Sequence, residues 1–231
     1  MQKIYLTSSR SPSSKLMKFL KELELIFPYS QKINRGSEFL TSLVSFCLLQ
    51  GVKNLIIVYE NRSKPSSLVI SHLPSGPTLF FTLSNVLYGI NKKKLRINGI
   101  LPNIVFDNLN SNLGQRITKV IGSLFPPASL NSKRIVTFTG FKSLILFGHY
   151  WNEKTGYGKK NFILKKMSPS FDLQPFKITL DILNKKNQKI EWILTPFLNS
   201  KKKKIFYLRI FFNFILNLRK KFNQKILFSR V

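Results

Sequence analysis

The side chains best suited to acid–base or metal chemistry are few and scattered along this chain. It holds 9 acidic residues against 38 Lys and Arg, with two histidines and one cysteine. Glu22 and Glu24 lie two apart on a predicted helix and therefore do not face each other. His72 and His149 are far apart in sequence, and a single cysteine cannot complete a zinc site. The sequence also lacks the glycine patterns of phosphate-binding loops. We therefore expect no catalytic residues, no metal and no cofactor.

The basic residues indicate a different chemistry. The net charge is +29 over 231 residues, and self-repulsion on this scale implies a polyanionic partner, either nucleic acid or an anionic membrane surface. A hydrophobic content of 43% is enough for a folded core. The chain has one alanine and an excess of Lys, Asn, Ile and Phe, which share A- and T-rich codons. We therefore expect that mutational bias has inflated the lysine count. Arg positions and local patterns therefore weigh more than total charge.

Several cations occur where phosphate groups are usually bound. Phosphate oxygens accept hydrogen bonds from Arg and Lys side chains and from free N–H groups at helix N-termini. Aromatic residues such as Phe141 and Tyr150 are candidates to stack on unpaired bases. The alternatives, that single cations are only solvated and that the aromatics belong to the core, stay open. The candidate RNA contacts at loop–helix junctions and strand starts are Arg10, Lys15, Arg35, Arg62, Lys64, Arg116, Lys119, Lys133 and Arg134.

The first part of the chain reads as an α/β unit. A strand at 3–7 leads into a polar turn, with Ser11 as N-cap and Pro12 at the first helical position. Apolar residues at helical spacing predict a helix that ends at Pro28. A second helix is predicted between Gly36 and Gly51. Branched and aromatic runs then predict strands at 54–59, 67–71 and 78–83.

After a loop rich in Lys and Asn at 89–99, the same pattern starts again. A strand at 103–107 and a polar turn are followed by a helix at 113–125, and both helices end in Phe-Pro. We therefore predict two related α/β halves, about 1–88 and 100–197, within a domain of residues 1–200. Further strands are predicted at 134–139, 143–149, 161–166, 171–180 and 189–195.

The C-terminal 201–231 differ in kind. A basic run at 201–204 precedes an apolar stretch at 205–228 with one polar stripe, which predicts an amphipathic helix. Packing on its own domain, docking to a partner and lying on a membrane surface all remain open for it. Polar residues interrupt the stretch, so we expect no membrane span. No secretory leader is evident, and the single Cys47 fits a reducing, intracellular compartment.

Five motifs occur in order over residues 3–197: Thr7 to Arg10 with Pro12 to Ser14, Asn34 to Gly36, His72 to Thr78, Phe106 to Asn108 with Leu113 to Arg116, and Arg134 to Phe138. Together they resemble the Brix domain, a ribosome-assembly fold. This resemblance implies two halves of anticodon-binding-domain type, in agreement with the internal repeat. Three further segments, 21–28, 70–78 and 190–199, are most similar to the Brix subgroup of the U3 small nucleolar ribonucleoprotein.

The resemblance implies a non-catalytic RNA-binding factor of the small-subunit processome in the nucleolus. Such a protein binds U3 small nucleolar RNA and pre-rRNA, promotes their pairing, and works beside Imp-three and Mpp-type processome proteins. We expect neither a membrane nor a second copy of this chain as partner. Asp107 is expected to orient a turn. By the resemblance, the RNA-side residues are Arg10, Arg35, His72, Arg116 and Arg134, and the residues that serve backbone geometry are Gly36, Gly76 and Gly114.

Two departures from the family pattern and three alternatives remain. The resemblance begins almost at Met1, so we expect contacts of the helical N-terminal extension common in this subgroup to be lost or replaced. Gly148-His149-Tyr150 stands where the family tends to have Arg-His-His or Arg-His-Tyr, which puts an Arg contact there in doubt.

The alternatives are a Brix factor of the large subunit, an RNA-modifying or RNA-cleaving enzyme, and a protein that binds membrane surfaces through its tail.

Overall fold

The computed structural model describes residues 3–89, 99–128, 132–154 and 162–194. The predicted tail at 201–231 and most of the predicted loop at 89–99 lie outside these residues. Within the described part of the chain, no helix is both long and apolar enough to cross a bilayer.

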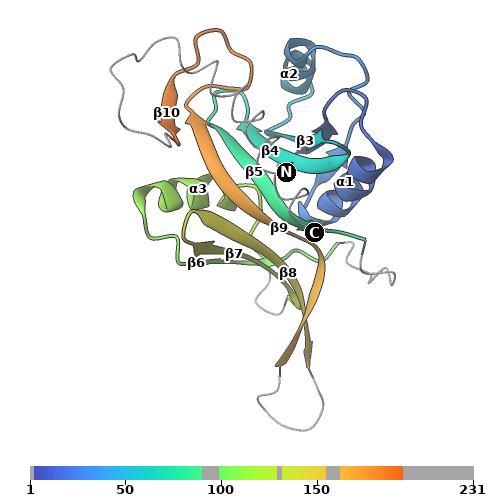
Figure 1. Cartoon of the computed structure of the whole chain (residues 1–231), viewed down its shortest axis with the longest axis vertical. Coiled ribbons are helices and arrows are strands. Elements are labelled where there is room, and N and C mark those ends of the chain that lie inside the picture. The colour runs from blue at the N-terminus through green and yellow to red at the C-terminus, as the bar shows by residue number, and fades with distance from the viewer. Residues whose placement is uncertain (1–2, 90–98, 129–131, 155–161, 195–231) are drawn as a thin grey trace, which may run out of the picture. The chain divides into compact units, whose positions relative to one another are not determined.

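The described residues form one mixed sheet (Figure 1). The strand order is β2-β1-β3-β4-β5-β9-β8-β7-β6, and β10 pairs with β9. The strands are β1 (Ile4–Ser8), β2 (Ser30–Lys32), β3 (Asn54–Asn61), β4 (Lys64–His72), β5 (Thr78–Leu87), β6 (Asn103–Asp107), β7 (Arg134–Phe141), β8 (Leu144–Lys154), β9 (Phe162–Thr179) and β10 (Ile190–Ile193).

The sheet has an internal repeat. β1 pairs with β3 in parallel, and β6 pairs with β7 in the same way. Each pair continues into two antiparallel strands, β4 and β5 in the first half and β8 and β9 in the second. The two halves join where β5 pairs with β9 antiparallel. The predicted α/β class with two repeated halves is confirmed, whereas the exact residue limits of the halves stay a prediction.

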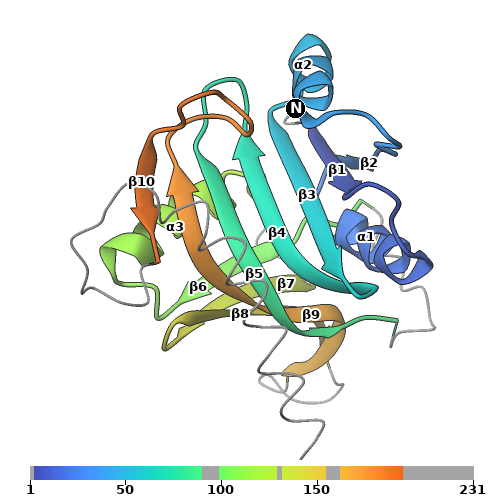
Figure 2. The ribbon, with the colours of Figure 1, turned by 45° about the horizontal axis from the view of Figure 1, so that its top comes forward.

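Helices α1 (Ser14–Ile26) and α3 (Asn112–Gly122) share one hydrophobic core with the sheet (Figure 2). Apolar residues of both helices are buried against the sheet, among them Leu16 and Phe19 of α1 and Ile117 of α3. The two Phe-Pro segments that follow these helices meet, because the rings of Phe27 and Phe125 lie 5.4 Å apart between centroids. The predicted repeat thus builds a core to which both halves contribute.

Helix α2 (Leu40–Leu49) belongs to a second cluster on the first half of the sheet. Its Leu43, Val44 and Cys47 are buried against side chains of β1 and β3, such as Leu55. Burial raises the pKa of the Cys47 thiol to about 11, so the thiol stays protonated at neutral pH.

Three local predictions were wrong, and one strand was missed. The N-cap of α1 is Ser13 rather than Ser11, because Ser11 takes a positive φ of 49° and the Ser13 hydroxyl accepts from Leu16 N at 3.2 Å. Helix α3 ends at Gly122, before the predicted limit. The strands predicted at 161–166 and 171–180 are one continuous strand, β9. Strand β2 was not predicted, since three mostly polar residues carry no periodic pattern.

Gly76 serves backbone geometry, as the family resemblance implies. Its φ is +94°, and a Cβ there would lie 2.2 Å from the carbonyl oxygen of Leu180. We therefore expect Gly76→Ala to lower the free energy of unfolding by about 2 kcal/mol, measured by urea denaturation. Gly36→Ala is the matched control, because its φ of +61° is also positive but no atom lies within 4 Å of the added Cβ. Equal losses in the two variants would contradict a steric role for the Leu180 contact.

Candidate nucleic-acid interface

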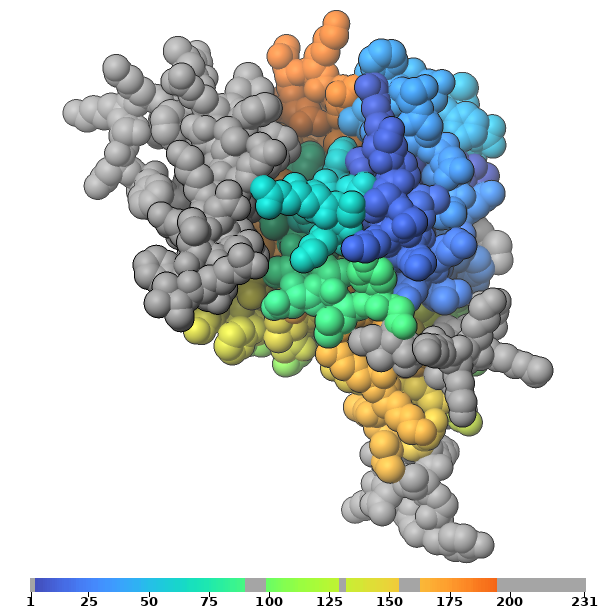
Figure 3. All heavy atoms as spheres, turned by 45° about the vertical axis from the view of Figure 1, so that its right-hand side comes forward, coloured from blue at the N-terminus to red at the C-terminus, as the bar shows by residue number. Residues whose placement is uncertain are grey.

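The turn between β1 and α1 is tied to the β3–β4 hairpin. Parallel pairing places Ser8, the last residue of β1, opposite Val58 of β3, so the C-terminal ends of both strands meet at one edge. Ser13 then donates from its backbone N and its hydroxyl to the Glu60 carboxylate, at 2.9 and 2.5 Å. In Figure 3 the dark blue N-terminal segment and the cyan β4 region lie side by side on one face. This edge therefore holds several loops in a fixed arrangement.

Five of the predicted RNA-contact residues gather at this edge, and we call them the first-half turn cluster. Arg10 lies in the β1–α1 turn with its guanidinium 4.8 Å from the ring centre of Phe39. The Arg35 guanidinium donates to the Glu38 carbonyl at 2.9 Å. Its charge also acts on the β3 residue Tyr59, where it opposes the rise in pKa that burial causes. The cluster consists of Arg10, Lys15, Arg35, Arg62 and Lys64, of which all but Arg35 are exposed.

The N-terminus of α1 is less free than the sequence suggested. Its first turn already faces the Glu60 carboxylate, and the Ser13 hydroxyl caps the N–H of Leu16. An anion at this position satisfies the helix dipole, so a phosphate gains little from the same N–H groups. In this half, the side-chain cations rather than the helix N–H groups are therefore the candidate partners for a phosphate.

The equivalent turn of the second half carries less free charge. Asn108 takes a positive φ, as Ser11 does, and its side-chain amide donates to the Gly140 carbonyl at 2.8 Å. The Arg116 guanidinium donates twice to the Glu191 carboxylate, at 2.7 and 3.0 Å. The charge of Arg116 is therefore balanced within the protein, while Lys119 on the same helix remains exposed. The structure does not bring these two residues to the first-half turn cluster.

His72 lies at a contact between the two halves. It ends β4, and its Nε2 lies 3.2 Å from the Val120 carbonyl oxygen and 3.2 Å from the Ser123 hydroxyl, both at the end of α3. Burial lowers the pKa of His72, so the ring is neutral at pH 7. A neutral, half-buried ring that binds a helix end has a structural role in the described geometry.

Arg134 is buried, and this placement corrects its assignment as an RNA contact. Its Nε donates to Nε2 of His149 at 3.0 Å, and its Nη1 donates to the Ile100 carbonyl at 3.1 Å. Its Nη2 contacts the carbonyls of Leu25 and Ile26, the last residues of α1. Burial lowers the pKa of Arg134 to about 10, which still leaves it charged at pH 7. All three guanidinium nitrogens are engaged inside the protein, so none is available to a phosphate.

The remaining candidates are spread over the second half. Lys133 is exposed directly before β7. Phe141 is 53% exposed at the β7–β8 turn, with the Lys142 ammonium 5.4 Å from its ring centre. The Tyr150 ring lies over Gly148, since a Cβ on that glycine would meet the ring at 2.5 Å. Phe141 is thus exposed with a lysine over its ring, whereas Tyr150 is half-buried. Among the described residues, no group of three His, Cys, Asp or Glu side chains converges as a metal site would require.

Comparison with known proteins agrees with this architecture. The Brix domain model matches residues 9–177. The U3 small nucleolar ribonucleoprotein protein IMP4 of Bos taurus is 36% identical over 206 residues, covering 88% of this chain and 70% of that protein. The imp4 protein of Schizosaccharomyces pombe is 37% identical over 202 residues, with 87% and 69% covered.

One solved structure supports the fold. The crystal structure of a probable ribosomal biogenesis protein from Aeropyrum pernix K1 aligns with a TM-score of 0.53 at 15% identity, over 75% of this chain and 96% of that one. At this level of identity the likeness concerns the fold alone. The family model, the sequence identities and the repeated sheet all give the same result: this chain belongs to the Brix domain family and is similar to the U3 small nucleolar ribonucleoprotein protein IMP4.

Proposed function

We propose that this protein is a non-catalytic RNA-binding ribosome-assembly factor of the small-subunit processome. It binds U3 small nucleolar RNA and pre-rRNA and promotes their pairing during early processing of the 18S precursor. Membership of the Brix family and the similarity to IMP4 proteins of the U3 ribonucleoprotein support this proposal. By the same similarity we propose a nucleolar location and Imp-three and Mpp-type proteins as partners.

The observation that carries the RNA-binding part is the first-half turn cluster. Five cations from three loops, one helix start and one strand start are held at one sheet edge, and the nearby Glu60 carboxylate is occupied by Ser13. Two RNA strands repel each other through their phosphates, and a cationic surface that contacts both releases counterions and lowers that repulsion. Exposed Lys119 and Lys133 are proposed as additional backbone contacts. Arg116 can contribute only after it leaves Glu191.

The test of the proposed function is crosslinking of the full chain to RNA in cells, followed by sequencing of the bound RNA. We expect enrichment of U3 RNA and of the small-subunit precursor at the segments that pair with it. Recovery of large-subunit precursor RNA in their place would overturn the assignment to the small subunit.

The turn cluster gives a quantitative prediction in vitro. The triple variant R10Q/R62Q/K64Q is expected to weaken RNA binding and to reduce the slope of log K against log salt by about 2, since each phosphate contact to a single strand contributes about 0.7. The measurement is a binding titration at several salt concentrations.

The matched control is K53Q/K186Q/K189Q, which removes the same charge from exposed lysines at the opposite strand ends. We expect its salt slope to stay near that of the unmodified protein. If both triple variants lose the same slope, the binding follows total charge and the turn cluster is not the interface.

A further inference from the structure

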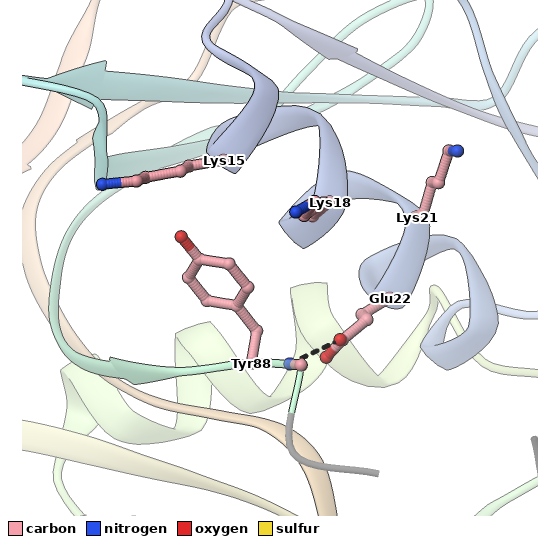
Figure 4. Close-up of a pocket in the computed structure, with 6 residues that line it drawn as sticks. Lys15, Lys18, Lys21, Glu22 and Tyr88 are labelled. Atoms are coloured by element: carbon pink, nitrogen blue, oxygen red, sulfur yellow. Dashed lines mark hydrogen bonds between the residues drawn. The ribbon is translucent and has the colours of Figure 1, made fainter. Parts of the chain in front are cut away.

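The solvent-facing side of α1 forms one wall of a groove that the sequence did not reveal. Lys15, Lys18 and Lys21 line it together with Glu22, and Tyr88 and Gly89 at the end of β5 form the other wall (Figure 4). Its volume is about 530 Å³, within the range of pockets that hold small ligands, so it has room for a nucleotide or two and not for a duplex. The groove begins at Lys15, which is also a member of the first-half turn cluster.

The charge of this groove is not compensated within the described protein. Lysines three apart on a helix are neighbours and repel each other. No carboxylate of the described residues forms an ion pair with any of the three. The nearest acid, Glu22, accepts a hydrogen bond from Gly89 N at 2.6 Å and so fastens the end of β5 to α1. The Lys15 and Lys18 end therefore attracts an anion, and the Lys21 end, beside Glu22, does so less.

Tyr88 supplies a fixed aromatic surface in the same groove. Its ring packs on the buried Phe19 of α1, with 5.6 Å between ring centres and an angle of 56° between the planes. Figure 4 shows its hydroxyl directed toward the Lys15 side chain, while the Lys21 side chain points away. Because Phe19 already holds the ring, stacking a base on it orders little additional structure.

We propose that this groove binds a single-stranded RNA segment, with backbone phosphates at Lys15 and Lys18 and an unpaired base stacked on Tyr88. The inference rests on the proposed RNA-binding function and adds a site to it. Stacking on an aromatic ring requires a base that is not already paired, which is why the groove selects a single strand over a duplex. An RNA strand bound at the first-half turn cluster continues along α1 into this site through Lys15.

The experiment measures binding of the full chain to a fluorescent uridine-rich single strand and to a hairpin of the same length. Tyr88→Leu is expected to weaken binding of the single strand about tenfold, whereas Tyr88→Phe stays within about twofold because it keeps the ring. The loss on the hairpin is expected to be smaller than on the single strand. Lys18→Gln is expected to reduce the salt slope by about 0.7, and Lys53→Gln, an exposed lysine outside the groove, to leave affinity unchanged.

A second measurement does not depend on the folding of any variant. Ultraviolet crosslinking of the unmodified chain to a strand that contains 4-thiouridine, followed by mass spectrometry, is expected to identify the peptide that holds Tyr88. If the unmodified chain does not bind RNA, the proposed function fails and the groove site with it. A different result would overturn the groove proposal alone. In that case the unmodified chain binds RNA and the R10Q/R62Q/K64Q variant weakens binding, but Tyr88→Leu and Lys18→Gln do not, and Tyr88 is not crosslinked.

Discussion

Replacement of Arg134 by leucine is expected to lower the free energy of unfolding by about 3 kcal/mol, because it removes a buried donor group without removing its acceptors. The carbonyls of Leu25, Ile26 and Ile100 lose their contacts with the guanidinium, and His149 loses its hydrogen bond. Two of these carbonyls end α1, so the connection of that helix to the second half is weakened. The measurement is urea denaturation at pH 7.

Two comparisons separate this structural role from an RNA contact. Arg62→Leu is the matched control, because Arg62 is exposed at the β3–β4 hairpin, and we expect it to change the free energy of unfolding by less than about 0.5 kcal/mol. In RNA titrations under conditions where both variants are folded, Arg134→Leu is expected to retain the salt slope of the unmodified protein, and Arg62→Leu to reduce it. A stable Arg134→Leu variant with a reduced slope would return Arg134 to the RNA interface.

The elements were predictable wherever a local period decides the structure. The apolar face of α1, with Leu16, Leu20 and Leu23, repeats at helical spacing, and burial of that face needs no knowledge of its partner. Strands β3, β4 and β5 are rich in branched and aromatic residues and were found at the expected places. The Ser13 cap was missed because Ser11 and Ser13 stand on either side of Pro12 and are equally good N-cap residues by type. Only the hydrogen bonds from Ser13 to Glu60 distinguish the two.

The contacts and the burial of the charged side chains were not predictable in the same way. Arg134 reaches the Leu25 carbonyl over 109 residues of sequence, and Arg116 reaches Glu191 over 75. Nothing in the composition or spacing distinguishes these arginines from Arg62, which stays in solvent. Contacts between segments far apart in the sequence decide this: Arg134 reaches the end of α1 in the first half, and β10, which pairs with β9, holds Glu191 beside Arg116.

The two strand–turn–helix segments therefore differ in free positive charge, although the sequence predicted two similar basic turns. Both halves have the same strand–turn–helix geometry, with a positive φ in the turn and a serine N-cap, Ser13 or Ser111. At these two turns the free cations nevertheless lie mainly in the first half, because Arg116 is paired with Glu191 and Arg134 is buried. Under the proposed function, the turn of the first half is therefore the better candidate of the two for contact with RNA.

Acidification from about pH 6.5 to about pH 4 is expected to destabilise the unmodified protein by about 3 kcal/mol more than a His149→Gln variant. The pKa of His149 is lowered from 6.5 to about 4, mainly by burial and to a smaller extent by the charge of Arg134. In the unfolded chain the imidazole takes up a proton near its ordinary pKa, whereas in the folded chain it stays neutral and accepts from the Arg134 Nε. The contribution of neutral His149 to stability is therefore complete above pH 6.5 and is lost as the pH falls toward 4.

Glutamine is the informative replacement because its amide oxygen can still accept a hydrogen bond from Arg134 but does not titrate. Urea denaturation of both proteins at intervals between pH 7 and pH 4 gives the difference, in which the titration of the carboxylates largely cancels. His72→Gln is a second control: the pKa of His72 is lowered too, but its ring is only half-buried, so we expect a smaller difference over the same range. Parallel curves of stability against pH for the unmodified protein and His149→Gln would mean that His149 takes up its proton at the same pH in the folded and the unfolded chain. That result would contradict a neutral His149 that accepts a hydrogen bond from Arg134.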